Sequence, residues 1–337
     1  MNPIFYALTL VFIFSCKEKD DMTTYPIPES EWTRLTNHSA EDFHPSFSPD
    51  GQRILFDSHR TGLYEVYTIK TDGTDPKQLT QGMVTNDHPR WSPDGSKIVF
   101  ESDQHGNKDV FQMNADGSGR TRLTTRTQLD GAGFYSPDGS RISYIVLHND
   151  AFDLYVMNED GSDDLRLTQN VIHDFGQVWS PDGHDLAYME QLDGQFDIFK
   201  IPADGSSNPI NLSRDAAEDE EPAWSPDGSL IAFISNREGN YEIYTMHPDG
   251  SEVIRLTTTP LPEREIAWSP DGQQILFTRG DDFEADIYIM QADGSSVKQI
   301  TENESRETVP SWGPDGESIV FVSLADGNYE IYTASLK

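Results

Sequence analysis

One short stretch returns along the chain at a nearly constant spacing. Its clearest copy is Trp91-Ser92-Pro93-Asp94-Gly95. The serine position recurs every 44 or 45 residues, at Ser48, Ser92, Ser136, Ser180, Ser225 and Ser269, and as Gly313 in the seventh copy. A period of about 40–50 residues indicates a propeller or an array of similar units.

Each repeat has the pattern of four short strands. An aromatic residue precedes the serine, and Pro-Asp-Gly supplies the turn residues that end the first strand. Alternating apolar residues, such as Ile98 and Phe100, predict the second strand. A triplet of an acid, an aliphatic and an aromatic residue, such as Asp109-Val110-Phe111, predicts the third. A turn at Asp-Gly then leads to a short fourth strand.

The two ends of the repeat region predict how the ring closes. The last repeat stops after its third strand, Glu330-Ile331-Tyr332, and a fourth-strand sequence, Arg34-Leu35-Thr36, precedes the first repeat. We therefore expect an all-β fold, a propeller of seven four-stranded antiparallel blades, in which the N-terminal strand completes the last blade. Such closure leaves few free sheet edges.

These residues resemble the TolB-type, WD-repeat-like propeller family from about residue 32 to residue 337. The resemblance implies one propeller domain over residues 32–337. TolB itself carries an α/β domain before a propeller usually counted as six blades, whereas this chain has seven repeats and no room for that domain.

The N-terminal segment predicts export. Residues 1–15 are apolar and too few to span a bilayer, as in a signal peptide. Cys16, the one cysteine, follows directly and resembles the lipidated residue of a bacterial lipoprotein, although the segment before it lacks Lys and Arg and has a bulky Phe14. An ordinary signal peptide with an incidental cysteine is the alternative. Residues 16–31 then form the lipid anchor and a flexible tether.

The charge balance narrows the choice of partners. Asp and Glu total 58 against 24 Lys and Arg, for a formal net charge of −34. This excess opposes binding to nucleic acid and to anionic lipid, so we expect membrane contact only through the anchor and a monomeric protein in the periplasm or at the cell surface. Basic partners or cations are favoured, and most of these charges serve as a solvated surface.

One polar position recurs five residues before each blade aromatic. We call it the acidic slot; its members are Asp42, Asn86, Asp130, Asp174, Asp219, Glu263 and Glu307. We expect these side chains around the channel mouth, where a ring of carboxylates would attract calcium, another divalent cation or a basic partner. The alternative is structural: each acid accepts hydrogen bonds within its own loop.

Three histidines are candidates for a channel metal site. His44 and His88 occupy the same position of adjacent repeats, and His173 lies three residues earlier in register. Some polysaccharide lyases of similar propeller form hold a metal with channel histidines, but no full set of ligands repeats here.

Two functions remain open at this point. The first is a non-catalytic module that binds a protein or glycan through its variable loops or channel, with no cofactor required. The second is a polysaccharide lyase or hydrolase with a metal at the channel. A Gly-x-Ser-x-Gly nucleophile motif, His-Glu-x-x-His, a phosphate loop and a sialidase aspartate box are all absent from the sequence.

Overall fold

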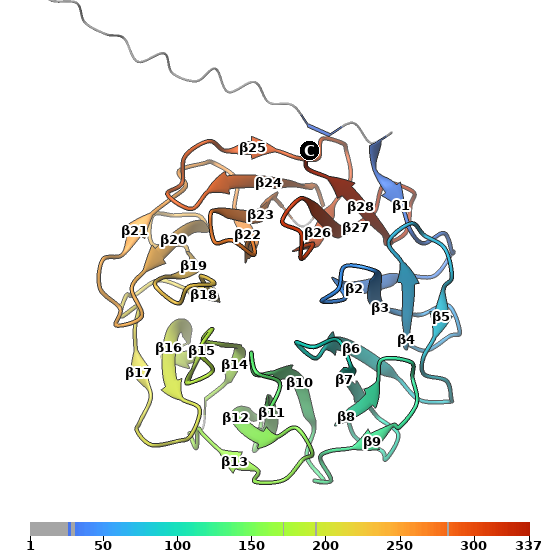
Figure 1. Cartoon of the computed structure of the whole chain (residues 1–337). Coiled ribbons are helices and arrows are strands. Elements are labelled where there is room, and N and C mark those ends of the chain that lie inside the picture. Colours follow the sequence, from blue (N-terminus) through green and yellow to red (C-terminus); the bar gives the residue numbers. More distant parts are fainter. Residues whose placement is uncertain (1–25, 28–30, 171, 193, 282) are drawn as a thin grey trace, which may run out of the picture.

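The computed structural model describes residues 26–27, 31–170, 172–192, 194–281 and 283–337. The predicted signal peptide, Cys16 and most of the predicted tether lie outside these residues. Within them, the chain forms seven four-stranded antiparallel sheets arranged as blades around a central axis (Figure 1). The seven-bladed propeller predicted from the repeat is confirmed.

The first strand of each blade is innermost (Figure 1). These strands are β2 (Asp42–Phe47), β6 (Asn86–Trp91), β10 (Asp130–Tyr135), β14 (Asp174–Trp179), β18 (Asp219–Trp224), β22 (Glu263–Trp268) and β26 (Glu307–Trp312). The second strands are β3 (Arg53–Ser58), β7 (Lys97–Ser102), β11 (Arg141–His148), β15 (Asp185–Leu192), β19 (Ile231–Ser235), β23 (Gln274–Gly280) and β27 (Ser318–Ser323).

The third and fourth strands complete each blade toward the rim. The third strands are β4 (Glu65–Lys70), β8 (Asp109–Asn114), β12 (Ala151–Asn158), β16 (Gln195–Pro202), β20 (Glu242–Met246), β24 (Ala285–Gln291) and β28 (Glu330–Ser335). The fourth have two residues each: β5 (Lys77–Gln78), β9 (Thr121–Arg122), β13 (Leu165–Arg166), β17 (Ile210–Asn211), β21 (Ile254–Arg255), β25 (Lys298–Gln299) and β1 (Thr33–Arg34).

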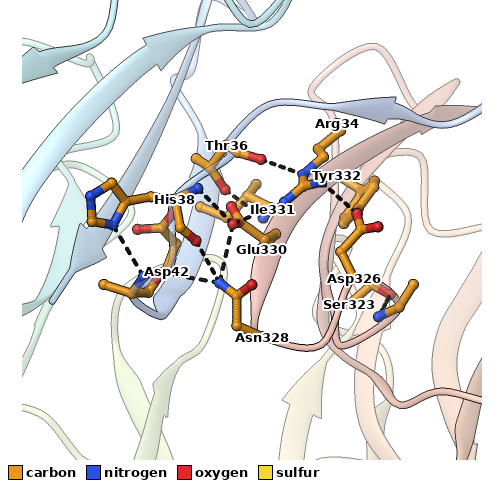
Figure 2. A network of polar contacts seen from close by, with 12 residues as sticks. Arg34, Thr36, His38, Asp42, Ser323, Asp326, Asn328, Glu330, Ile331 and Tyr332 are labelled. Carbon is orange, nitrogen blue, oxygen red and sulfur yellow. Dashed lines mark hydrogen bonds and ion pairs between the residues drawn. The ribbon is translucent and has the colours of Figure 1, made fainter. Parts of the chain in front are cut away.

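The N-terminal strand closes the ring as predicted. β1 pairs with β28, with Thr33 opposite Thr333 and Arg34 opposite Tyr332. Side chains reinforce this junction (Figure 2): the Arg34 guanidinium contacts the Glu330 carboxylate at 3.0 Å, and the Ile331 N–H donates to the Thr36 hydroxyl at 2.9 Å. The last blade is therefore held by residues almost 300 positions apart in the chain.

The core consists of the blade-to-blade contacts. The second and third strands bury their aliphatic and aromatic side chains, among them Phe56, Phe100 and Phe233, between adjacent sheets. A single sheet would leave these faces in water, so the blades are stable only as a ring. None of the described residues belongs to a helix long and apolar enough to cross a membrane.

The two ends of the blades differ in their connections. Because neighbouring strands are antiparallel, connections between second and third strands lie at the same end as those from a fourth strand to the next blade. We call this end the loop face. The Pro-Asp-Gly and Asp-Gly turns lie at the other end, which we call the turn face.

Candidate functional site: the channel and the loop face

The acidic slot lies at the first residue of each innermost strand. All seven side chains belong to fully buried residues: Asp42, Asn86, Asp130, Asp174, Asp219, Glu263 and Glu307. A buried carboxylate needs hydrogen bonds or a cation close by. In three blades an arginine from the second strand or the loop after it supplies both, through the pairs Asp42–Arg60, Asp219–Arg237 and Glu263–Arg279, with contacts of 2.9–3.0 Å.

The slot acids in blades three and four are less well satisfied. Arg126 comes only within 3.7 Å of the Asp130 carboxylate, and Asn170 donates to Asp174 at 3.4 Å. Burial raises the pKa of Asp130 to about 6 and that of Asp174 to about 7. In blade seven, amide and hydroxyl groups of Asn303 and Ser323 bond Glu307.

Because all seven slot residues are fully buried, they do not present an exposed ring of carboxylates at the channel mouth. Side chains of the same blade and of the preceding blade contact the slot residues. Asn86, for instance, donates to the buried Glu65 carboxylate at 2.8 Å. Cation binding by the slot stays a prediction, which the dependence of the melting temperature on calcium would test.

A second repeated position, two residues further along, points to the neighbouring blade. Every innermost strand has a β-bulge there, and one residue adopts a positive φ between 46° and 67°. We call this the bulge slot; it contains His44, His88, Ala132, Gly176, Glu221, Glu265 and Val309. In five of the seven blades, the backbone N–H of this residue donates to a side chain of the preceding blade. The Val309 N–H, for example, donates to Glu265 at 2.8 Å, and the Ala132 N–H donates to Glu101 at 2.7 Å.

Blades one and two bring both bulge-slot histidines together. The ring centroids of His44 and His88 lie 4.3 Å apart. Asp57, which is fully buried on β3, joins them: its Oδ2 contacts His44 Nδ1 at 2.8 Å and accepts the His88 backbone N–H at 2.9 Å. His44 and His88, which occupy the same position of adjacent repeats, are thus neighbours in the ring, and their role as metal ligands stays a prediction.

A cluster of charged groups continues from His88 toward blade three. His88 Nδ1 lies 3.5 Å from Asp87 Oδ1 and 3.8 Å from Glu101 Oε2. The ammonium group of Lys108 contacts the same two carboxylates, at 2.9 and 2.8 Å. Burial alone would lower the pKa of Lys108, but the carboxylates of Glu101 and Asp87 outweigh it and raise that pKa.

His173 does not join this group. Its ring packs against Phe152 and Phe175, with centroid separations of 5.8 and 6.2 Å, at the entry to β14. The three candidate histidines are thus divided between two places in the ring. Asp57, Asp87, Glu101 and Lys108 were not predicted from the sequence. The sequence does contain one signal for this cluster. Asp57 and Glu101 are carboxylates at a second-strand position where the other five blades have an uncharged residue.

The loop face is strongly acidic. Among the described residues of its connections, nine carboxylates are exposed: Glu41, Asp150, Asp215, Glu238, Asp281, Glu284, Glu302, Glu304 and Asp326. Arg214 is the one exposed Lys or Arg described there. Two of the acids, Asp215 and Asp326, also pair with arginines.

Apolar side chains project from the same connections. Met83 is 95% exposed and Phe283 is 85% exposed, and Leu63, Leu192 and Leu261 are less so. The other large exposed hydrophobic residues lie on the rim strands or directly before them: Leu165, Ile210, Val253 and Ile254. The loop face therefore combines negative charge with individual exposed apolar side chains.

Comparisons with known proteins agree with this fold. A family model described as the TolB beta propeller domain matches residues 17–170, 178–261 and 264–337. An uncharacterized protein of Agrobacterium fabrum is 33% identical over 60 residues, which are 18% of this chain and 20% of that protein. The match thus covers only about a fifth of that relative's length.

Solved structures extend the likeness to the whole ring. A putative TolB from Agrobacterium tumefaciens is 23% identical, with a TM-score of 0.57 over 80% of this chain and 96% of that one. An oligogalacturonate lyase in complex with manganese is 18% identical, with a TM-score of 0.76 over 93% and 96%. A puromycin-hydrolyzing peptidase of Mycobacterium tuberculosis is 12% identical, with a TM-score of 0.73 over 93% and 55%. At these identities the likeness shows the fold alone.

Proposed function

Because this chain belongs to the TolB beta propeller domain family, we propose that it is an exported, non-catalytic binding module whose loop face takes a basic segment of a protein ligand. The observation that carries the proposal is the charge of that face, nine exposed carboxylates against one exposed cation in its described connections. A surface of one sign raises the local concentration of ligands of opposite sign and speeds their association.

The alternative use of these charges is solvation of the surface, and the apolar side chains argue against solvation alone. Met83 and Phe283 are almost fully exposed on the same face. Exposed Met and Phe side chains are typical anchors of protein interfaces, where they are buried on binding. A ligand with basic residues flanking apolar ones would satisfy both features, so we favour a protein over a neutral glycan.

Two variants with equal charge test this proposal. The loop-face variant carries Asp281→Asn, Glu284→Gln, Glu302→Gln and Glu304→Gln. The control carries Asp72→Asn, Asp116→Asn, Asp249→Asn and Asp293→Asn, which are exposed on the turn face. Each of these turn aspartates accepts the N–H two residues later, which an asparagine can also accept.

The probe is a fluorescent peptide that alternates lysine and leucine, titrated at low and high salt. We expect the loop-face variant to bind it about tenfold more weakly at low salt, and the control to bind it like the wild type. Equal losses in both variants would mean that the probe responds to net charge, and the proposed face would then be wrong.

Export through Cys16 is part of the same proposal. One acyl chain gives only marginal membrane binding, so firm anchoring requires the several chains of a lipoprotein. We expect Cys16→Ala to move the protein from the membrane fraction to the soluble fraction, or to block its processing. An unchanged membrane fraction in the variant would contradict the anchor.

A lyase or hydrolase acting on polysaccharide is the second candidate, and the group formed by Asp87, His88 and Glu101 favours it. Oligogalacturonate supplied with manganese tests it directly, through the ultraviolet absorbance of unsaturated products. We expect no product, because the proposed binding module has no reaction at the channel. Product formation that is lost in Glu101→Gln would replace the binding module with the enzyme.

A further inference from the structure

The geometry points to a divalent transition-metal site in the channel, with Asp87, His88 and Glu101 as ligands and Lys108 as the built-in competitor of the ion. This inference is independent of the loop-face proposal, because it concerns other residues and has its own readout. It also differs from the predicted site of three histidines, since it uses one imidazole and two carboxylates.

The first argument is a departure from the repeat. Asp57 and Glu101 occupy one position of the second strands, opposite Phe43 and Asp87 of the innermost strands. The other five blades carry uncharged residues there: Ile145, Met189, Ile234, Thr278 and Val322. A buried carboxylate is costly unless it is paired, so the blade architecture does not require these two acids.

The second argument is the spacing of the donor atoms. One donor atom each from Asp87, His88 and Glu101 lies within 4.8 Å of the other two. Ligand atoms about 2.0–2.2 Å from a zinc ion lie within about 4.4 Å of one another, so small side-chain movements suffice. His88 Nδ1 is buried, and the carboxylate oxygens of Asp87 and Glu101 lie 3.5 and 3.8 Å from it, so the three donor atoms converge on one place.

The surroundings hold His88 in place. Asp57 accepts the His88 backbone N–H at 2.9 Å, and the His44 ring lies against the His88 ring. Metal-binding sites depend on such outer contacts to orient their ligands. His88 lies at the β-bulge and adopts a positive φ of 51°. Its side chain therefore does not follow the regular alternation of strand side chains between the two faces of the sheet.

Lys108 shows that a cation already fits between the carboxylates. Its Nζ contacts Asp87 Oδ2 at 2.9 Å and Glu101 Oε2 at 2.8 Å. A divalent ion that binds there displaces the ammonium group, which is 28% exposed and has a flexible stem. One imidazole with two carboxylates suits zinc or manganese better than calcium, which prefers oxygen ligands alone.

The test measures zinc binding to the full chain by calorimetry, and manganese binding by electron paramagnetic resonance. We expect one ion per chain in the wild type. His88→Gln and Glu101→Gln should each weaken binding at least about tenfold. His59→Gln, an exposed histidine in a loop-face connection, is the matched control and should leave the affinity unchanged.

Lys108→Gln gives the sharpest result, because it removes the competitor and leaves the three ligands. We expect it to bind zinc more tightly than the wild type and to gain more in melting temperature when zinc is added. This variant keeps the test decisive even where the ligand variants fold poorly. An absence of saturable binding, equal affinity in His88→Gln, or weaker binding in Lys108→Gln would each overturn the site.

Discussion

Aspartates at the two ends of the blades have opposite properties. At the turn face, the Pro-Asp-Gly aspartates are exposed and accept hydrogen bonds from their own turn. Asp94, for example, accepts from the Ser92 hydroxyl at 2.7 Å and from the Ser96 N–H at 3.0 Å, and these bonds lower its pKa to about 2. At the loop end, Asp174 of the acidic slot is buried, and burial raises its pKa to about 7.

The difference teaches that a repeated acid serves the fold in two physical ways. The turn aspartates favour their charged form, because local donors stabilise it at little cost in desolvation. The six slot acids are buried away from water and depend on nearby hydrogen-bond donors or cations, and only three of the six have an arginine within 3.0 Å. The comparison predicts large effects at the loop end and small ones at the turn end.

Breaking a buried slot pair should have the largest effect. In blade five, Arg237 contacts both oxygens of Asp219, at 3.0 and 3.2 Å. Arg237→Met leaves the buried carboxylate without its cation, and we expect it to lower the free energy of unfolding by about 3–5 kcal/mol in chemical denaturation. Asp227→Asn, in the turn of the same blade, should cost far less.

The double variant Arg237→Met with Asp219→Asn is the control for this experiment. Removing both charges leaves no unpaired ion, so most of the lost stability should return. If the double variant is as unstable as Arg237→Met, the arginine acts through its packing over Tyr244 rather than through its charge.

The pH dependence of stability sharpens the comparison. A carboxyl group with a raised pKa in the folded state stabilises the fold at low pH, and that stability is lost as pH rises from the unfolded value of about 4 toward the folded value. For Asp174 the window runs from about pH 4 to about 7. Asp174→Asn removes this titration and should stabilise the protein relative to the wild type at pH 8, by of the order of 2 kcal/mol.

Thermal melting of both proteins across that window checks the sign. The advantage of Asp174→Asn should shrink as the pH falls toward 4, because the wild-type carboxyl then binds its proton. A constant difference at all pH values would show that the substitution acts through hydrogen bonding to Asn170 alone.

The repeat pattern was sufficient to predict the fold. Local turn chemistry, alternation and the spare strand Arg34-Leu35-Thr36 specify seven blades and the closure, because each signal lies within a few residues of the element it forms. Closure is confirmed by the pairing of Thr33 with Thr333, although the strand itself ends at Arg34.

The side-chain partners were not predictable in the same way. The slot identified Asp42 and Asp219 correctly as recurring acids, but their burial depends on arginines 18 residues later, and those arginines do not recur in every repeat. The channel cluster depends on pairing Asp87 with Glu101 across two strands, and on a bulge that no residue type in the sequence marks.

The turn end should give the smallest effect. Asp94→Ala removes the acceptor for the Ser92 hydroxyl and the Ser96 N–H. The Ser96 N–H is exposed, so water can replace its bond, and the buried Ser92 hydroxyl still accepts the Lys97 N–H at 2.9 Å. We expect a fall in melting temperature of roughly 1–3 °C at neutral pH. The melting temperature of Asp94→Asn should fall less, because the asparagine amide oxygen can accept the same Ser96 N–H. The lowered pKa of Asp94 makes this effect depend on pH. The charged carboxylate stabilises the folded state above about pH 4, and this stabilisation is lost as pH falls toward about 2. The melting temperatures of wild type and Asp94→Ala should therefore converge in acid, whereas the wild type and Asp174→Asn differ most at high pH. Divergence of the Asp94 pair in acid would contradict the assignment of its carboxylate to the turn.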